Sequence, residues 1–487
     1  MLMKNKTSFY LLAISFVSTI GGFLFGYDTA IISGCNSFLE SQYNLTPSML
    51  GWVVSSALLG TILGCIISGK ITDKYGRKKA LILAASCLTV SAFGSMLPPR
   101  FLGNLDSSYW FTSSLDTSFL ILIIVRIIGG IGVGVTSVVA PIYISELTLP
   151  EKRGKMVSLY QLSITLGILL AFLVDWIVLY LAGDNAGVIS GTKIGLLDWL
   201  FVEELWRGMF GTEIPIAILF LLLLFFVPES PRWQVYNGKE EGAFSTMVKI
   251  GGVEQAKVQM AEIKGATTVE TQGIKELFKP YLRRPFLIGI LLPMFSHLSG
   301  IAAIMYFAPN ILNESIKSIE SSFLGAVLVG LVNSIFTFIA IMNIERYGRR
   351  KLLLIGVVGV AISLTGVSVL FAIGSSLVII PLLMYVAFFA FSYGPIVWVI
   401  ISEIFPTKIR GIAVSIGSFS LMVTGFFITL TNPIFIELIT PVGTFFLYAT
   451  LTLPAIWFIW KFVPETKGKT LEEIEISWKK LSASDKI

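Results

Sequence analysis

The stretch DKYGRKK, at residues 73–79, recurs as ERYGRRK at residues 345–351. Each copy is a short basic segment between two apolar runs, and about 20 apolar residues are enough to span a bilayer as a helix. Two further pairs of segments repeat in the same order: SELTLPEKRG at 145–154 with SEIFPTKIRG at 402–411, and VPESPR at 227–232 with VPETKG at 463–468. Parallel repeats of this kind are typical of carriers that rock two bundles about a central site.

The composition is that of a membrane protein. Of the 487 residues, 55% are hydrophobic and 14% are charged, whereas an average soluble protein has about 25% charged residues. We therefore predict an all-α membrane protein with twelve transmembrane helices in two six-helix repeats. The predicted helices cover about residues 9–34, 50–70, 80–97, 119–143, 157–181, 210–227, 286–312, 321–344, 352–373, 376–401, 414–436 and 442–462.

Basic residues determine the predicted orientation. The chain contains 36 lysine and arginine residues, and nearly all of them fall in loops on the same side as both termini. The exceptions are Arg126 inside a predicted helix and Arg100, Lys193, Arg207 and Lys317 in the opposite loops. Since cytoplasmic loops are enriched in lysine and arginine, we predict a multi-pass protein of the cell (inner) membrane with both termini in the cytoplasm.

The repeats also divide the chain into domains. We predict an N-terminal six-helix bundle over residues 1–227 and a C-terminal six-helix bundle over residues 285–463. Residues 228–284 are polar, with glutamate and lysine mixed at helical spacing, and are expected to form short helices in a cytoplasmic linker. Residues 464–487 form a cytoplasmic tail in this interpretation.

The repeated segments place acids beside bases at the predicted cytoplasmic mouth. Arginine suits such pairs because its planar fork can bind a carboxylate through two hydrogen bonds. One hypothesis is that these charges form a latch that holds the cytoplasmic side closed and separates when that side opens; the alternative is that they only anchor the topology. The candidate latch residues are Arg77, Glu146 and Arg153 in the first half, and Arg349, Glu403 and Arg410 in the second.

Asp28, Arg126 and Glu213 are ionisable residues inside predicted spans. Intramembrane charges are costly, and they usually pair and mark ion or proton pathways. A conformational change that alters water access to Asp28, or its distance from Arg126, would change whether Asp28 is protonated. A proton-coupled carrier needs that property, although a fixed Asp28–Arg126 pair in a uniporter is the alternative. Asp175, near the outer end of the fifth helix, is expected to be solvated or capping rather than a substrate ligand.

Taken together, several motifs of the chain resemble the sugar porter family of the major facilitator superfamily, and most of all its bacterial D-xylose/proton symporters. The resemblance covers about residues 10–475 and is carried by GYD, GRKK, RIIGGIGVG, YISEL, KRGK, VPESPRW, FAPNI, ERYGRRK, GPIVWVIISEIFP and PETKGKT. It implies the major facilitator fold and an alternating-access carrier for a monosaccharide or polyol, with a sugar site built by helices 5, 7, 8, 10 and 11. It also implies that Asp28 is the proton site, Arg126 its partner and Glu213 a modulator.

Sugars are bound by amide and hydroxyl side chains that pair with their hydroxyls and by aromatic faces that pack on their C–H surfaces. The resemblance implies that Gln161, Asn333 and Trp398 are ligands and that Phe25 and Tyr306 line the site. The full set of substrate-binding candidates is Phe25, Gln161, Ser296, His297, Tyr306, Asn333, Tyr393 and Trp398.

Helices 7 and 11 depart from the family pattern. Ser296, His297 and Ala302 stand where the family usually has two glutamines and an asparagine, and Leu421 and Met422 stand where the xylose carriers have glutamine and tryptophan. Losing a partner for a buried hydroxyl costs about 1–3 kcal/mol. We therefore predict a substrate with fewer hydroxyls, another shape or a larger apolar part than xylose. His297, the one histidine, is either a packed neutral imidazole or a ligand that titrates near neutral pH.

These observations predict a proton-coupled symporter of a monosaccharide or sugar-like solute; a facilitative uniporter and a non-transporting nutrient sensor are the alternatives. The expected partners are the solute, protons and the lipid bilayer, with no nucleic acid, and the chain is expected to act as a monomer. With one histidine and three dispersed cysteines, Cys35, Cys65 and Cys87, no metal site, cofactor or enzyme activity is expected.

Overall fold

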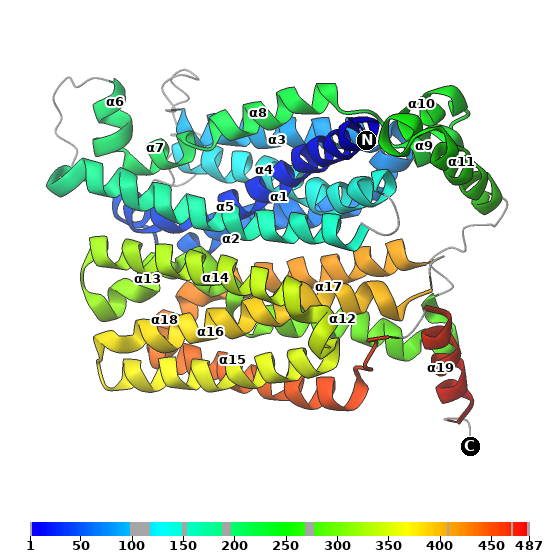
Figure 1. The fold of residues 1–487 in the computed structure, drawn as a ribbon. Helices are drawn as coiled ribbons and strands as arrows, with labels where there is room; N and C mark the ends of the chain where they lie inside the picture. Colours follow the sequence, from blue (N-terminus) through cyan, green and yellow to red (C-terminus); the bar gives the residue numbers. More distant parts are fainter. Residues whose placement is uncertain are drawn as a thin grey trace. The chain divides into compact units, whose positions relative to one another are not determined.

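A computed structural model describes residues 2–97, 117–148, 153–187, 196–267, 277–406, 409–468 and 471–484. Within these ranges every regular element is a helix (Figure 1). The prediction of an all-α fold is therefore confirmed.

The first five spanning helices are long and continuous, as their uninterrupted apolar runs predict. The part of the chain before the polar linker then ends in shorter pieces, so the predicted span 210–227 is built from α7 and α8. The elements are α1 (Leu2–Tyr43), α2 (Pro47–Tyr75), α3 (Arg77–Met96), α4 (Thr117–Leu147), α5 (Arg153–Ala182), η4 (Gly183–Asn185), α6 (Leu196–Asp198), η5 (Trp199–Glu203), α7 (Leu205–Gly211) and α8 (Ile214–Phe226).

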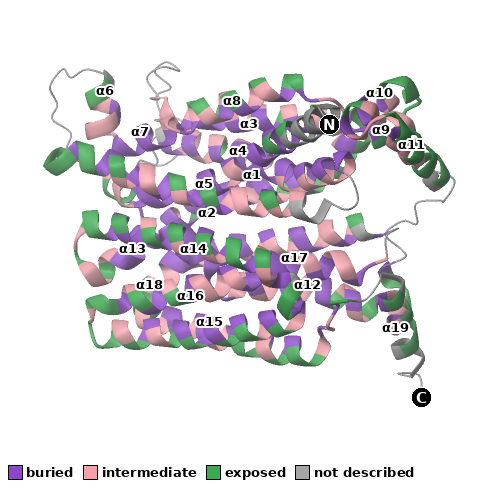
Figure 2. Cartoon of the chain, in the orientation of Figure 1, coloured by how far each residue is buried: buried purple, intermediate pink, exposed green. Residues whose placement is uncertain are grey.

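The polar segment that follows forms three short helices; Figure 2 shows many exposed residues on α11, whereas α10 alternates between exposed and buried residues. The helices that follow α11 are formed mainly by the apolar runs of the second half. The elements are α9 (Pro231–Tyr236), α10 (Glu240–Gly251), α11 (Val253–Thr267), η7 (Pro280–Leu282), α12 (Arg283–Leu298), α13 (Ile301–Ile316), α14 (Ile319–Tyr347), α15 (Arg349–Ala372), η8 (Ser376–Val378), α16 (Ile379–Phe391), α17 (Tyr393–Ile404), α18 (Arg410–Phe462) and α19 (Leu471–Ser484).

Eleven helical segments in the described ranges are long and apolar enough to cross a membrane. The last of them, Gly411–Phe462, has 52 residues, which is too long for one crossing. Thr440 inside it has φ 61° and ψ 166°, and Pro441 follows, so the helical path is broken there. This segment therefore supplies the two final predicted spans, and the twelve predicted crossings are all accounted for.

Two other predicted spans are broken near their middles. Gly300, with φ 88°, separates α12 from α13, and Ser392, with φ −122° and ψ −81°, separates α16 from α17. Only glycine fits at position 300, because a Cβ there would stand 2.5 Å from the Tyr448 ring. Breaks of this kind expose backbone polar groups at mid-membrane depth, which is tolerated only where the backbone is buried in protein or lines a cavity.

Residues that contact one another densely form two compact units. The first unit is Met1–Tyr27, Leu59–Gly167 and Phe210–Thr271; the second is Asp28–Leu58, Ile168–Met209 and Gln272–Ile487. Four of the five limits between these units fall within helices, in α1, α2, α5 and α7. The predicted bundle limits at residues 227 and 285 stay a prediction.

We call the outer end of a spanning helix the end away from the repeated turns at residues 73–79 and 345–351. In the second unit the outer parts of α1, α2 and α5 pack closely on C-terminal helices. The backbone of Gly51 lies close to that of Leu430, and the backbone of Gly330 lies close to that of Leu169. A Cβ at either glycine would come within 3 Å of the opposite backbone, so only glycine allows this approach. The rings of Trp52 and Phe426 also meet edge to face at 6.0 Å.

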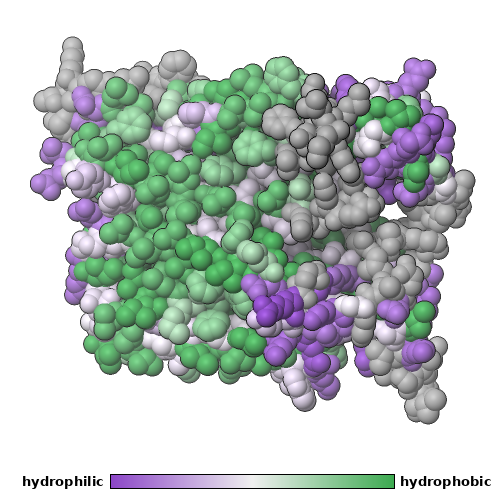
Figure 3. Space-filling view, viewed as in Figure 1, coloured by the Kyte–Doolittle hydropathy of each residue, from purple (hydrophilic) through white to green (hydrophobic). Residues whose placement is uncertain are grey.

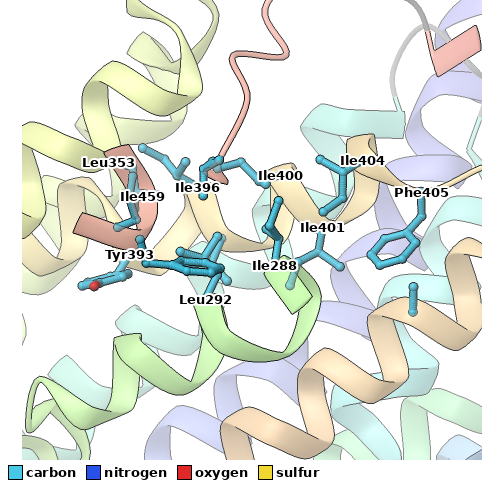
Figure 4. Close-up of a cluster of buried hydrophobic side chains, with 14 of the residues drawn as sticks. Ile288, Leu292, Leu353, Tyr393, Ile396, Ile400, Ile401, Ile404, Phe405 and Ile459 are labelled. Atoms are coloured by element: carbon cyan, nitrogen blue, oxygen red, sulfur yellow. The ribbon is translucent and has the colours of Figure 1, made fainter. Parts of the chain in front are cut away.

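The interior of the second unit contains a dense apolar cluster that fixes α12, α15, α17 and α18. Figure 4 shows the isoleucines of α17 in this cluster together with Ile288 and Leu292 of α12 and Ile459 of α18. The outside of the spanning helices is apolar as well: Phe226, Leu181 and Leu438 are more than two-thirds exposed. Figure 3 shows such side chains over the spanning helices, whereas hydrophilic ones gather over α10 and α11. This surface suits lipid.

Candidate functional site

The first repeated turn is held by a carboxylate from the motif that follows α8. Glu229 accepts hydrogen bonds from the backbone N–H groups of Arg77, at 2.9 Å, and Lys78, at 3.1 Å, at the start of α3. Gly76, with φ 93°, permits this approach, because a Cβ there would stand 2.2 Å from the Glu229 carboxylate. Arg77 also donates to Glu146 Oε1 at 2.9 Å, and Ser230 Oγ donates to the other oxygen of Glu146.

The second repeated turn has the same construction. Glu465 accepts from the backbone N–H groups of Arg349, at 3.0 Å, and Arg350, at 3.1 Å, at the start of α15. Gly348 has φ 87° and lies against the Glu465 carboxylate. Arg349 donates to Glu403 Oε1 at 2.9 Å. A carboxylate at a helix N-terminus is stabilised by the unpaired N–H groups and by the helix dipole, so each half has the same charged cap.

The two caps differ in their titration. Burial raises the pKa of Glu229, against the opposing effect of the backbone N–H groups of Ser230, Lys78 and Arg77. For Glu465 burial also acts to raise the pKa, but backbone N–H groups, of Lys467 and Arg349 among others, outweigh it and lower the pKa. The cap of the first half is therefore the one that is neutralised first as the pH falls.

The structure resolves which acid meets which base within each half. Glu146 pairs with Arg77 and Glu403 pairs with Arg349. The side chains of Arg153 and Arg410 lie outside the part of the chain that the structure describes. Both pairs join residues of one half, so they fasten the loops of that half. The latch between states stays a prediction.

Glu229 and Glu465 were not among the residues predicted from the sequence, although the repeats indicate them. Both belong to a VPE segment that recurs at the same place in each half, and each half has one basic turn for it to cap. A repeated acid beside a repeated helix start is the pattern of a helix cap.

The three predicted intramembrane ionisable residues are all buried. Asp28 on α1 is 5% exposed, Arg126 on α4 is 1% exposed, and Glu213 immediately precedes α8 and is 2% exposed. Within the first unit the Arg126 guanidinium lies 5.4 Å from the Phe210 ring centre. Asp28 belongs to the second unit, so its pairing with Arg126 stays a prediction.

A hydrogen bond links the neighbours of Asp28 and Glu213. The hydroxyl of Tyr27, beside Asp28, lies 2.7 Å from the hydroxyl of Thr212, beside Glu213. Glu213 also stands at the N-terminus of α8, where a helix dipole favours negative charge. Within the first unit, α1 is thus joined at Tyr27 to the segment that precedes α8.

Asp175 is buried, unlike its predicted environment. It is 1% exposed on α5 and lies against Gly34 of α1, so the expectation of a solvated or capping residue is wrong. The apolar run of α5 nearly ends at this position, which suggested the headgroup region, but a neighbouring helix covers the side chain.

Ser296 and His297 lie at the end of α12, immediately before the break at Gly300. Ser296 Oγ donates to the Pro293 carbonyl at 2.7 Å and lies 3.3 Å from His297 Nδ1. His297 is partly exposed and its ring faces Gly425 of α18, where a Cβ would stand 2.7 Å from His297 Cδ2. Gly425 therefore provides the space that the imidazole occupies.

The break itself is supported by tyrosines that the sequence analysis did not name. The hydroxyl of Tyr385 on α16 donates to the Ser299 carbonyl at 3.1 Å, and Tyr448 on α18 packs on Gly300. The Tyr448 hydroxyl in turn lies 3.0 Å from Asn432 Oδ1 and donates to it. Buried tyrosines with one polar contact are the expected means of holding a freed carbonyl.

The structure divides the substrate candidates between the two units. Phe25 and Gln161 belong to the first unit and are partly exposed, whereas the other six belong to the second. Of those six, Tyr306, Asn333 and Tyr393 are buried, and Tyr393 packs on Phe389 at 5.7 Å at one end of the apolar cluster in Figure 4. Ser296 is buried too, and Trp398 and His297 are partly exposed. Their joint action on one substrate stays a prediction.

The outer side of the second unit is joined by polar contacts near Tyr306. Asn36 Nδ2 of α1 donates to the Tyr306 carbonyl of α13 at 2.8 Å, and Asn310 Nδ2 of α13 lies 3.4 Å from Ser37 Oγ. α13 is kinked at Phe307, the residue that follows Tyr306. Among the described residues no group of three or more His, Cys, Asp or Glu is placed to hold a metal ion.

Comparison with known proteins identifies the family. The family described as "Sugar (and other) transporter" matches residues 14–478. The chain belongs to that family. Within the range of this sugar transporter match lie both caps, the buried ionisable residues and the broken helices, and the family consists of transporters rather than enzymes.

Two relatives match nearly the whole chain. The D-xylose-proton symporter of Escherichia coli (strain K12) is 36% identical over 489 residues, which cover 97% of this chain and 96% of that protein. The arabinose-proton symporter of Bacillus subtilis (strain 168) is 37% identical over 479 residues, covering 98% and 96%.

A solved structure matches as well. The xylose transporter XylE from E. coli, in a partially occluded inward open conformation, has a TM-score of 0.80 at 35% identity, covering 95% of this chain and 99% of that one. The major facilitator fold is thereby established.

Proposed function

We propose that this protein is a proton-coupled symporter of a monosaccharide or sugar-like solute that works by alternating access. The observation that carries the proposal is the buried carboxylate of Asp28, which is 5% exposed in the middle of a spanning helix. The two relatives named above are proton symporters of pentoses, which supports the same assignment.

The chemistry requires a group that is neutral in one state and charged in another. An ionised carboxylate in an apolar interior is strongly disfavoured, so Asp28 takes up a proton when it is shielded and loses it when water or a cation reaches it. Tyr27 ties this part of α1 to the segment that carries Glu213, so movement of α1 changes the surroundings of both acids. Binding and release of the proton thereby depend on the conformation.

The solute is expected to bind beside the broken helices of the second half. Ser296 and His297 stand next to the break at Gly300, and Trp398 follows the break at Ser392. A break lets part of a helix tilt and lets the backbone bind a polar ligand, as in other carriers with discontinuous helices. Because Ala302, Leu421 and Met422 offer no strong hydrogen bond, the expected solute has fewer buried hydroxyls than a pentose such as xylose.

The test is uptake into proteoliposomes of a panel of pentoses, hexoses, polyols and glycosides, with and without an inward proton gradient. Wild-type protein is expected to accumulate one of these solutes against its gradient only when the proton gradient is present. D28N is expected to lose that accumulation and to keep exchange of solute across the membrane. D184N, which alters an exposed acid, serves as the matched control and should behave like wild type.

Each alternative has its own outcome. Uptake by wild type that ignores the proton gradient identifies a uniporter, and solute binding without flux identifies a sensor. Undiminished accumulation by D28N contradicts the proton role of Asp28 whatever the solute.

The orientation follows from the charges. Both termini are placed in the cytoplasm, with α9, α10 and α11 on the same side, because basic residues gather in these segments. A tag after residue 487 is expected to be digested in inverted vesicles and protected in right-side-out vesicles. One chain provides every element of the proposed path, so a monomer is expected to transport. Uptake by single copies reconstituted into liposomes checks this expectation.

A further inference from the structure

α1 and α5 pack through a narrow seam of glycines and backbone atoms. At each glycine of the seam an added Cβ would come within 3 Å of the other helix. On α5 the contacting positions are separated by four, three and eight residues, which places them on one helical face. The contacts are Gly22 with Tyr160, Gly26 with Ile164 and Gly167 with Phe23 in the first unit, and Gly34 with Asp175 in the second.

Asp175 is a carboxylate at the outer end of this seam. It is 1% exposed, and a Cβ at Gly34 would stand 2.4 Å from its Oδ2. The Gly34 amide interacts weakly with the carboxylate, but neither oxygen accepts a hydrogen bond of good geometry from the described residues. The other contacts of the seam involve glycines, backbone atoms and uncharged side chains.

In the described part of the chain, the charged residues on α1 from position 28 onward are two acids, and the one on α7 is an arginine that already pairs with an acid. Asp28 and Glu40 lie on α1, six residues before and after Gly34, which is about 9 Å along the axis in each direction. Arg207 of α7 forms an ion pair with Glu204 and packs on the Trp206 ring. An ionised Asp175 would thus be buried near other acids, and burying an unpaired charge is among the most unfavourable events in folding.

The position of the seam links Asp175 to opening of the outer side. Asn36, two residues after Gly34, donates to the Tyr306 carbonyl of α13. Leu169, on α5, meets Gly330 of α14. Separation of these contacts pulls on both helices that enclose the Asp175 carboxylate.

We propose that Asp175 is a second proton-binding residue of the transport cycle. It is protonated while the outer parts of α1 and α5 are packed as observed, and it releases its proton to the outside water when the seam opens. This inference rests on the proposed proton-coupled function, but it concerns a different residue and a different step.

The direction of the pH effect follows from linkage. The packed state binds the proton more tightly than the opened state, so acid stabilises the packed state and rising pH favours opening. For one proton the ratio of the two states changes by up to tenfold per pH unit between the two affinities.

Hydrogen exchange of the full-length protein in lipid nanodiscs measures this ratio at the outer segments, residues 35–43 and 308–316. After correction for intrinsic chemistry, exchange in wild type and in D184N is expected to rise with pH by up to tenfold per unit. D175N is expected to show slow exchange with no such dependence, because asparagine stays neutral. A D175N protein with the wild-type pH dependence overturns the proposal.

A second measurement does not depend on the folding of D175N. Asp28 and Asp175 are the aspartates that are buried in the described part of the chain. Infrared spectra of D28N labelled with carbon-13 aspartate are expected to show a protonated carboxyl band at neutral pH that disappears on alkalinisation. Absence of that band, or a band that persists at every pH, overturns the proposal and leaves the role of Asp28 untouched. Loss of proton coupling in the uptake test, in contrast, concerns Asp28 alone.

Discussion

Replacing Gly425 by alanine tests whether His297 faces the substrate. The added Cβ would stand 2.7 Å from His297 Cδ2 and 3.3 Å from Nε2. Non-bonded carbon atoms are in optimal contact at about 3.5–4.0 Å, so the imidazole has to move by roughly 1 Å. Because His297 is partly exposed, it can move without leaving the fold, and the displacement is expected to be felt in the site.

The magnitude follows from two opposing terms. Overpacking a filled space costs about 1–3 kcal/mol, whereas alanine is favoured over glycine in a helix by up to about 1 kcal/mol. The net loss of protein stability is therefore about 0–2 kcal/mol. If the full cost of overpacking, about 1–3 kcal/mol, instead weakens substrate binding, the KM rises by about 5- to 150-fold.

The assay is proteoliposome uptake of the best solute and its nearest analogues. Gly69→Ala is the matched control, because a Cβ at Gly69 meets nothing within 4 Å while the gain in helix propensity is the same. In a His297→Ala background, adding Gly425→Ala should change the KM little, because the imidazole that the new Cβ would displace is absent. The reasoning is refuted if Gly425→Ala matches Gly69→Ala in KM and preference, or if its effect persists without the imidazole.

Four further outcomes are expected. Glu465→Gln should lower the free energy of unfolding by about 1 kcal/mol relative to wild type at neutral pH, as measured by thermal unfolding. The difference should vanish in acid, because the lowered pKa of Glu465 means that its stabilisation is lost as the pH falls. Glu229→Gln should instead remove a gain in stability that wild type shows as pH falls through the raised pKa of Glu229. Glu403→Gln should slow or bias transport if its pair with Arg349 belongs to a latch, and leave the rate and the conformational populations unchanged if the charges only anchor topology. Tyr385→Phe should lower stability by about 1 kcal/mol and alter KM, measured by unfolding and uptake, since it frees the Ser299 carbonyl.

The positions of the helices could be predicted from the sequence because lipid imposes one strong rule. Every backbone group in the hydrocarbon must be satisfied within a helix, so long apolar runs become helices almost without regard to tertiary contacts. The interruptions could not be predicted in this way. Ser392 lies in a span whose hydropathy stays high although Gly394 and Pro395 follow it. Gly300 combines φ 88° with a Tyr448 ring that leaves no room for a side chain. A hydropathy pattern contains no information about such a neighbour.

The residues of the candidate site were predictable to a different degree. Asp28, Arg126 and Glu213 stand out because charge is rare in an apolar run, and all three are buried. Asp175 gave the opposite impression, since its burial depends on contact with Gly34, which is 141 positions away in the sequence. Glu229 was open to prediction from its repeat with Glu465, but only if each acid is considered together with the helix start that it caps.

The arrangement of α1 offers a physical route for coupling. The limit between the two compact units falls between Tyr27 and Asp28, so α1 belongs to the first unit up to Tyr27 and to the second unit from Asp28 onward. Before this point α1 packs on α5 through Gly22 and Gly26, and Tyr27 contacts Thr212; beyond it Asn36 binds the backbone of the broken seventh span. In the proposed mechanism a proton on Asp28 acts on α1, a helix that takes part in both sets of contacts. A displacement of α1 would then change the surroundings of Asp28 and the contact of Asn36 with the seventh span together, without direct contact between Asp28 and the solute.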